Sequence, residues 1–218
     1  RVPAIYAKPP RNRCNAGAGV SAETVGIGKA GRGVGAIHSG DRSYFCVRSL
    51  TGIPDQTGGG DEAIIYVMSD IHGCFDKYQE MLELIEFVPR DTLYVLGDVI
   101  DRGPDGIRIL QDMNIRPNVF PLLGNHEFTA AVCLPWLMEE VTGQSLAALD
   151  ETQLAALSEW IANGGGPTLQ SLKRLSREER EDILEYFQEM ELYAEVEAGG
   201  RRFVLTHSAL EHFAPDKP

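Results

Sequence analysis

The sequence predicts an α/β fold, built on an open sheet whose strands alternate with helices. Three apolar runs of strand length each end in a polar loop, and each loop is followed by residues that can start a helix. These runs span residues 64–68, 92–96 and 118–122. Repeated strand-to-helix junctions place their loops together at the carboxyl edge of such a sheet, where ligands bind. The polar residues of the three loops are therefore expected to converge on one small volume.

Length and composition are consistent with one domain of moderate size and argue against two classes of partner. The chain has 218 residues, of which 43% are hydrophobic and 24% are charged, as in a globular protein with a real core. Its formal net charge of −12 argues against a general nucleic-acid-binding surface. No apolar run approaches the roughly 18 residues that span a bilayer, so no membrane partner is expected. Oligomeric state is not indicated.

The four cysteines form neither a CxxC pair nor a regular disulfide framework. We therefore expect free thiols in a reducing compartment. No signal peptide is visible, which favours a cytoplasmic location. The chain begins with Arg1 and ends in Pro218 without a clear terminal element, so it is expected to be a fragment of a longer protein.

Residues 1–61 differ from the rest and are expected to be disordered or loosely packed. Lys and Arg outnumber the acids there, glycine is dense and no apolar periodicity is visible, so this segment can bury little surface. Residues 26–31 match a GxGxxG pattern, but without the flanking strand and helix that a dinucleotide site requires. The glycines at 58–60 predict a linker into a folded domain that spans residues 62–218.

The first half of this domain alternates strands with helices. After the strand at 64–68, apolar residues recur with helical spacing at Tyr78, Met81, Leu82 and Ile85. The strand at 92–96 leads to a helix from about residue 104 to 113, and the third strand follows at 118–122.

The second half is mainly helical and ends in a hairpin. Helices are expected over 125–138 and 150–162, and Ser176 with Glu179 forms a capping box that starts another. Strands at 192–196 and 203–206 are joined through two glycines, which predicts a hairpin with His207 at its end.

The three loops carry residues suited to a metal site. Asp70 and His72 alternate, so both can face one side of an extended loop, although a helix cap followed by a surface His is the simpler alternative. A carboxylate and an imidazole suit Mn, Fe or Zn better than Ca. The two oxygens of Asp98 can bridge two ions. Closely placed carboxylates repel unless a cation lies between them, which favours a site for two metals.

Other loop residues suit phosphate chemistry. Arg102 can hold a phosphate through two parallel hydrogen bonds, or it can merely pair with Asp101. Asn125 offers a neutral oxygen ligand, or it caps a helix. His126 can donate a proton to a leaving group if Asp101 holds its other ring nitrogen. With a metal site already argued, His207 is interpreted as a further ligand.

Together these residues resemble the phosphoprotein phosphatase branch of the calcineurin-like metallophosphoesterases. The resemblance covers about residues 64–218 and is carried by the order DxH, GDVIDRG, GNHE and a later His. It implies a β-sandwich of mixed sheets flanked by helices, with an incomplete second sheet here. It also implies two divalent ions, Mn favoured and Fe or Zn as alternatives, held by Asp70, His72, Asp98, Asn125 and His207, with Asp98 shared. His126 and Asp101 would form the general-acid pair, and Arg102 would contact phosphate.

The resemblance implies a metal-dependent phosphomonoester hydrolase, most similar to a bacterial Ser/Thr protein phosphatase that acts on a phosphorylated protein or a small phosphoester. Glu127 favours this class, because relatives that cleave dinucleoside tetraphosphates usually have Asp there. Leu123 departs from it, because the protein-phosphatase signature tends to have a basic residue at this position. A dinucleoside polyphosphate hydrolase of the same fold is one alternative. An inactive metal- or partner-binding fragment is another, because the family's further His and Arg, downstream of His207, are not in this sequence.

Overall fold

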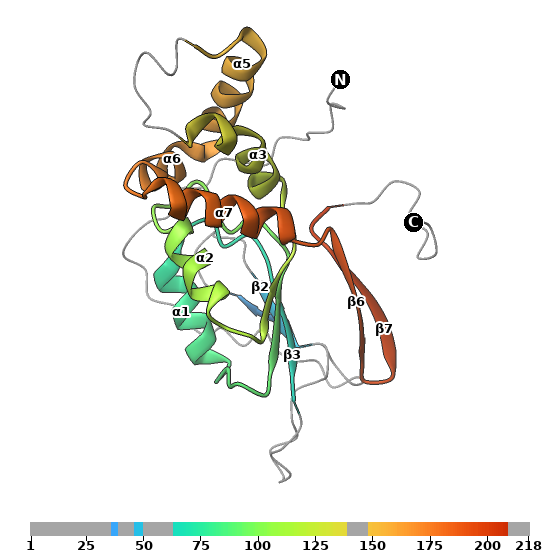
Figure 1. The fold of residues 1–218 in the computed structure, drawn as a ribbon. Coiled ribbons are helices and arrows are strands. Elements are labelled where there is room, and N and C mark those ends of the chain that lie inside the picture. The colour runs from blue at the N-terminus through green and yellow to red at the C-terminus, as the bar shows by residue number, and fades with distance from the viewer. Residues whose placement is uncertain (1–35, 39–45, 50–62, 139–147, 209–218) are drawn as a thin grey trace.

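The computed structural model describes residues 63–138 and 148–208 in full, together with the backbone of residues 36–38 and 46–49 (Figure 1). Its centre is a five-stranded mixed sheet in the order β1-β2-β3-β4-β5. The strands are β1 (Ala36–His38), β2 (Cys46–Ser49), β3 (Ile65–Met68), β4 (Thr92–Val95) and β5 (Val119–Pro121). The last three run parallel to one another, whereas β1, β2 and β3 pair antiparallel. The α/β fold expected from the sequence is confirmed.

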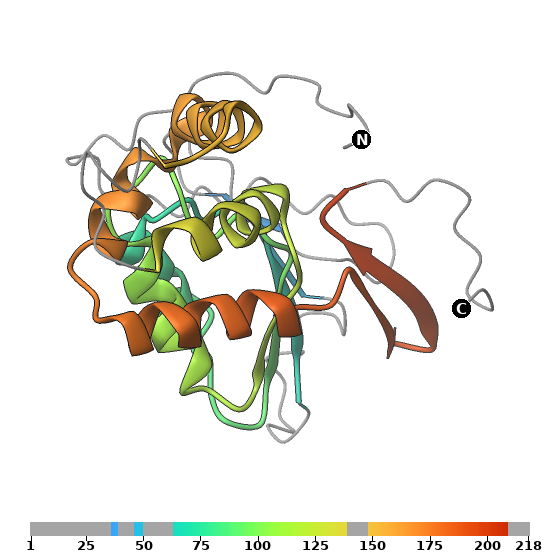
Figure 2. The ribbon, with the colours of Figure 1, turned by 45° about the horizontal axis from the view of Figure 1, so that its top comes forward.

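Helices α1 (Phe75–Leu84) and α2 (Gly106–Asn114) are the connections between the parallel strands. They lie on one side of the sheet, and the hairpin described below lies on the other (Figures 1 and 2). The helical periodicity of the sequence explains this packing, because Tyr78, Met81 and Leu82 of α1 are all buried. Alternate strand residues such as Met68 and Val95 point into the same core.

A helical layer follows β5. It consists of α3 (Asn125–Cys133), the short 3-10 helix η1 (Leu134–Leu137), α5 (Glu151–Trp160), the π-helical turn η2 (Ile161–Gly165), α6 (Gly166–Leu172) and α7 (Arg177–Glu189). The capping box of Ser176 and Glu179 starts α7 as predicted. The sequence did not predict η2 and α6, because residues 164–167 are three glycines and a proline, which normally end a helix.

The hairpin of β6 (Tyr193–Ala198) and β7 (Arg201–Thr206) forms a second, two-stranded antiparallel sheet. It turns at Gly199 and Gly200, both of which have positive φ. Val196 and Leu205 pack with Leu122 and with the sheet face that carries Val67 and Tyr94. The hairpin thereby covers part of the sheet face opposite α1 and α2, and β7 ends at His207.

The segment before residue 62 and the cysteines differ in part from what the sequence predicts. Residues 1–61 are expected from the sequence to be disordered or loosely packed. The structure describes two short strands within this segment, β1 and β2, and β2 pairs with β3. The rest of the segment, including the GxGxxG match, lies outside the described residues. The boundary near residue 61 stays a prediction. Of the cysteines, Cys133 is a buried free thiol, whereas Cys74 is disulfide-bonded, so the expectation of free thiols is wrong for Cys74.

Among the described residues, no helix combines the length and the apolar character needed to cross a bilayer.

Candidate functional site

The loops that follow β3, β4 and β5 meet at the carboxyl ends of these parallel strands. Backbone hydrogen bonds join the first two loops, from the His72 N–H to the Asp98 carbonyl (2.9 Å) and from the Gly103 N–H to the His72 carbonyl (3.0 Å). Gly73 and Gly103 allow this approach, because a Cβ on Gly73 would lie 2.5 Å from the Gly103 oxygen. The predicted convergence of the three loops is therefore confirmed.

The backbone of these loops is unusual. Non-glycine residues rarely adopt positive φ, because the Cβ then crowds the backbone. Five of them do so here: Asp70 (58°), His72 (46°), Asp98 (55°), Asp101 (68°) and Arg102 (65°). Such strain persists only where the surrounding structure enforces it, and it is concentrated at functional sites.

Glu127 enforces the conformation of the loop after β4. Its fully buried carboxylate accepts hydrogen bonds from the backbone N–H groups of Asp98 (2.8 Å), Val99 (2.8 Å) and Ile100 (3.1 Å), and also from Gly124 (3.2 Å). Burial raises the pKa of Glu127 to about 7, and the backbone donors oppose that rise. The side chain thus fixes the loop from beneath.

His72 presents an unpaired ring nitrogen to Asp98. Its Nδ1 lies 3.0 Å from the carbonyl oxygen of Ile100, which can only accept, so Nδ1 carries the proton. Its Nε2 is buried, finds no hydrogen-bond partner among the described residues, and lies 3.5 Å from Asp98 Oδ2 and 3.8 Å from Asp70 Oδ1. Burial, followed by the charge of Arg102, lowers the pKa of His72 to about 3, so the ring is neutral near pH 7.

His207 repeats this arrangement on the other oxygen of Asp98. Its Nδ1 lies 2.6 Å from the carbonyl oxygen of Leu96 and therefore donates to it. Its Nε2 lies 2.9 Å from Asn125 Oδ1 and 3.3 Å from Asp98 Oδ1. Two oxygen atoms therefore lie close to Nε2.

Asp98 thus lies between two groups of lone-pair donors. Its Oδ2 faces His72 and Asp70, and its Oδ1 faces His207 and Asn125. Burial raises the pKa of Asp98, which means that its charge lacks solvation. Imidazole nitrogens, carboxylates and an amide oxygen that converge in this way are the donor set that a divalent cation satisfies. The residues present therefore fit a divalent cation at Asp98, and the sharing of Asp98 by two cations stays a prediction.

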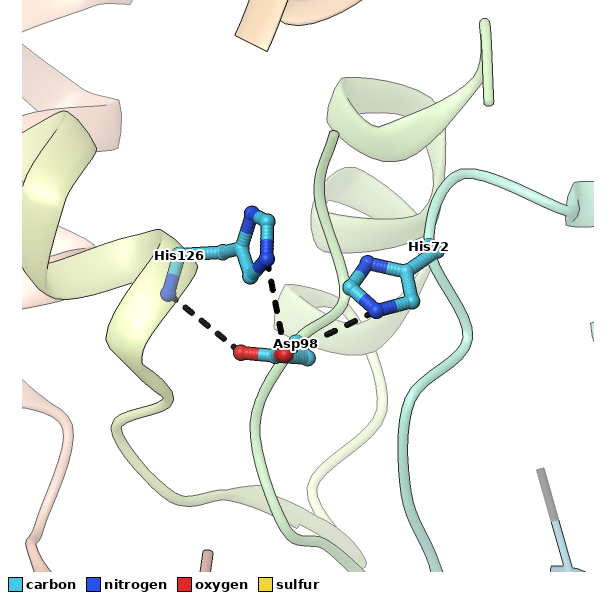
Figure 3. Close-up of side chains that lie close together, drawn as sticks. All are labelled: His72, Asp98 and His126. Atoms are coloured by element: carbon cyan, nitrogen blue, oxygen red, sulfur yellow. Dashed lines mark hydrogen bonds and ion pairs between the residues drawn. The ribbon is translucent and has the colours of Figure 1, made fainter. Parts of the chain in front are cut away.

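His126 also lies against Asp98, and two further residues hold its ring. His72, Asp98 and His126 offer ligand atoms within 4.8 Å of one another (Figure 3). His126 Nδ1 lies 2.7 Å from Asp101 Oδ2, and its Nε2 lies 3.1 Å from Arg102 Nη2. A guanidinium can only donate, so Nε2 accepts from Arg102 and Nδ1 donates to Asp101. Burial opposes protonation of His126, but the hydrogen bond to Asp101 and the charge of Asp98 raise its pKa.

All eight residues selected from the sequence thus lie in or beside one site, although their individual roles stay predictions. Sequence reasoning gave no structural role to Glu127 and did not find Trp160 and Thr168. Trp160 Nε1 donates to Asp101 Oδ2 (2.9 Å) and Thr168 Oγ1 donates to Asp101 Oδ1 (2.6 Å). The glycines after Trp160 were the one visible signal of a special backbone there.

A protein-family model and two named relatives match parts of this chain. Residues 64–217 match the model of the family described as calcineurin-like phosphoesterase. The chain is 31% identical over 148 residues to the symmetrical bis(5'-nucleosyl)-tetraphosphatase of Acidovorax sp. (strain JS42), covering 67% of this chain and 44% of that protein. It is 42% identical over 64 residues to the protein of the same name from Wigglesworthia glossinidia brevipalpis, covering 28% of this chain and 24% of that protein. The chain spans less than half the length of these relatives.

Proposed function

Because this chain belongs to the calcineurin-like phosphoesterase family, we propose that it is a metal-dependent hydrolase of dinucleoside polyphosphates. The observation that carries the proposal is Asp98, each of whose oxygens faces the Nε2 atom of an imidazole ring. In the proposed reaction, water cleaves one P–O–P bond of a bis(5'-nucleosyl) tetraphosphate. Symmetrical cleavage gives two nucleoside diphosphates.

In this proposal, one cation is held by Asp70, His72 and Asp98, and the other by Asp98, Asn125 and His207. Bound divalent cations supply Lewis-acid stabilisation of the phosphoryl oxygens and make water more acidic. The carbonyl groups of Ile100 and Leu96 hold the His72 and His207 rings with Nε2 facing Asp98. The metal identity is open between Mn, Fe and Zn.

Arg102 and His126 would act on the transferred phosphoryl group and on the leaving oxygen. In the described state, Arg102 donates to His126 Nε2, so that nitrogen carries no proton. A phosphoryl group is a stronger acceptor for the guanidinium than an imidazole is. Substrate would therefore draw Arg102 away, and Nε2 could then take up a proton and deliver it to the departing oxygen. Asp101 stabilises the imidazolium that this step requires.

One observation supports the choice of a dinucleotide substrate, and another weakens the argument for a protein substrate. The relatives reported above are named as tetraphosphatases. In addition, the residue that favoured a protein substrate, Glu127, is fully buried beneath a loop and bound to backbone N–H groups. It does not face the site, so its identity says little about what the site accepts. The comparisons therefore favour the dinucleotide alternative over the Ser/Thr phosphatase first expected.

The test is hydrolysis of bis(5'-adenosyl) tetraphosphate with excess Mn²⁺, with products separated by chromatography and a phosphoserine peptide assayed in parallel. We expect ADP as the sole nucleotide product, and a loss of at least about 100-fold in Asp98→Asn because one carboxylate serves both cations. If phosphate is released from the peptide and the dinucleotide is not cleaved, the result would favour the Ser/Thr phosphatase alternative. No turnover of either substrate would favour the non-enzymatic alternative.

A further inference from the structure

The helical segment from Trp160 to Thr168, here called the clamp segment, wraps around Asp101 and Arg102. It comprises the end of α5, the π-helical turn η2 and the start of α6. We propose that the clamp segment is a positioning element that orients the Asp101–His126 pair for proton transfer. This inference rests on the proposed function, because it concerns the same site.

The first contact of the clamp segment is with the Asp101 side chain. This carboxylate is fully buried and accepts three hydrogen bonds. Oδ2 accepts from His126 Nδ1 (2.7 Å) and from the Trp160 indole N–H (2.9 Å), and Oδ1 accepts from the Thr168 hydroxyl (2.6 Å). Two of the three donors therefore come from the clamp segment, and they fix the rotation of the carboxylate plane that His126 meets.

The second contact fixes the backbone of the same loop. The Thr168 hydroxyl also accepts from the Asp101 N–H (3.0 Å), so one hydroxyl binds both the main chain and the side chain of Asp101. The Gly164 carbonyl accepts from the Arg102 N–H (2.9 Å). Asp101 and Arg102 both have positive φ, and these external bonds oppose their relaxation to an ordinary conformation.

The first glycine of the clamp segment, Gly164, is explained by its close approach to Arg102. Gly164 has φ of 110°, and a Cβ there would lie 2.9 Å from Arg102 Cγ. The segment can approach the loop this closely only without a side chain at that position. The backbone kinks at Gly164, whose φ and ψ are not helical, and this kink presents the Gly164 carbonyl to the Arg102 N–H.

A buried Asp can be satisfied for stability alone, so the experiment must separate positioning from folding. Thr168→Val keeps the shape of the side chain and removes the hydroxyl, whereas Thr168→Ser keeps the hydroxyl and removes the methyl. General-acid catalysis matters most when the leaving group is poor. The full chain is therefore assayed with Mn²⁺ on 4-nitrophenyl phosphate, a good leaving group, and on phenyl phosphate, a poor one.

We expect Thr168→Val to lower kcat on phenyl phosphate on the order of tenfold, with a much smaller effect on 4-nitrophenyl phosphate and little change in KM. Thr168→Ser should restore the wild-type ratio between the two substrates. Trp160→Phe, which removes the indole N–H, should shift the ratio in the same direction and serves if Thr168→Val fails to fold. The proposal would be overturned if Thr168→Val lowered kcat equally on both substrates and Thr168→Ser showed the same loss.

A measurement independent of activity separates this inference from the proposed function. In the metal-free protein, the Nδ1 proton of His126 should give a downfield NMR signal that exchanges slowly with water, because it is bonded to Asp101. That exchange should quicken in Thr168→Val and not in Thr168→Ser. An unchanged signal in Thr168→Val would overturn the positioning role even if the enzyme is active. If the wild-type protein hydrolyses nothing, the proposed function fails and the NMR result alone decides the inference.

Discussion

At the scale of single residues, Glu127 does the most to shape the site without belonging to its chemistry. Each of its carboxylate oxygens accepts from two backbone N–H groups, Oε1 from Val99 and Ile100 and Oε2 from Asp98 and Gly124. Both carboxylate oxygens are therefore needed, and a substitution that removes either one leaves backbone N–H groups unpaired. The loop carrying Asp98 therefore depends on this side chain.

Glu127→Gln tests that dependence. The amide NH₂ of glutamine would have to face two N–H donors, leaving buried groups unpaired, which costs about 1–3 kcal/mol. We expect urea unfolding to show a loss of this size, with weaker Mn²⁺ binding. Glu185→Gln, at an exposed position on α7, is the matched control and should change neither quantity. If Glu127→Gln is as stable as the wild type, the loop after β4 keeps its conformation without the Glu127 carboxylate.

The residue scale also shows the reach and the limit of sequence reasoning. Asp98, Asp101 and Arg102 were found because they stand together in one short motif. Trp160 and Thr168 were not, because they lie 59 and 67 residues from Asp101 and reach it only through the fold. A Trp in an amphipathic helix is normally assigned to the core, and nothing local marks its N–H as a donor to the Asp101 carboxylate.

At the scale of elements, helix α2 ends in an ion pair that links stability to pH. Asp112 accepts hydrogen bonds from Arg116 Nε (2.7 Å) and Nη2 (3.1 Å). Burial alone would raise the pKa of Asp112, but the hydrogen bonds and the charge of Arg116, with smaller contributions from Tyr78 and Gln79, together outweigh it and hold this pKa below its usual range. The stabilisation is therefore present above the unfolded-state pKa of about 3.9 and is lost as pH falls through the lower folded-state value.

Asp112→Asn should make this dependence visible. The variant should be less stable than wild type by about 0.5 kcal/mol at pH 7, because a partly exposed pair contributes little. Urea unfolding at several pH values should show the gap closing below about pH 4. Asp182→Asn, on the exposed face of α7, serves as the control. A gap that stays constant with pH would assign the loss to packing rather than to charge.

Elements with strong periodicity or caps were predictable, and irregular ones were not. The burial of Met81 and Leu82 follows from their helical spacing, and α7 begins where its capping box lies. Strands β1 and β2 escaped prediction because they are short and lie in a glycine-rich segment. Their place in the sheet comes from pairing with β3, which is a long-range interaction that local sequence does not encode.

At the scale of the whole molecule, β1 and β2 extend the sheet on its β3 side. A chain that begins at residue 63 would lack both strands and leave the backbone N–H and C=O groups of β3 open to other chains. We expect this variant to associate, as seen by light scattering, and to lose at least several degrees of melting temperature, since about 1 kcal/mol corresponds to roughly 2–4 °C at this size. A monomer with the full-length melting temperature would show that the two strands contribute nothing to the core.

The left-handed backbone at Asp70, His72, Asp98, Asp101 and Arg102 has an evolutionary consequence. Glycine adopts such φ values without strain, so selection for thermal stability alone would drift toward glycine at the more exposed of these positions, Asp70 first. Each such replacement would erase a side chain to which the proposed function gives a role. Libraries of variants screened for heat resistance should therefore become enriched in inactive proteins with glycine in these loops. Selection for turnover should instead remove glycine from the same positions. The difference between the two glycine frequencies would measure how strongly function and stability oppose each other here.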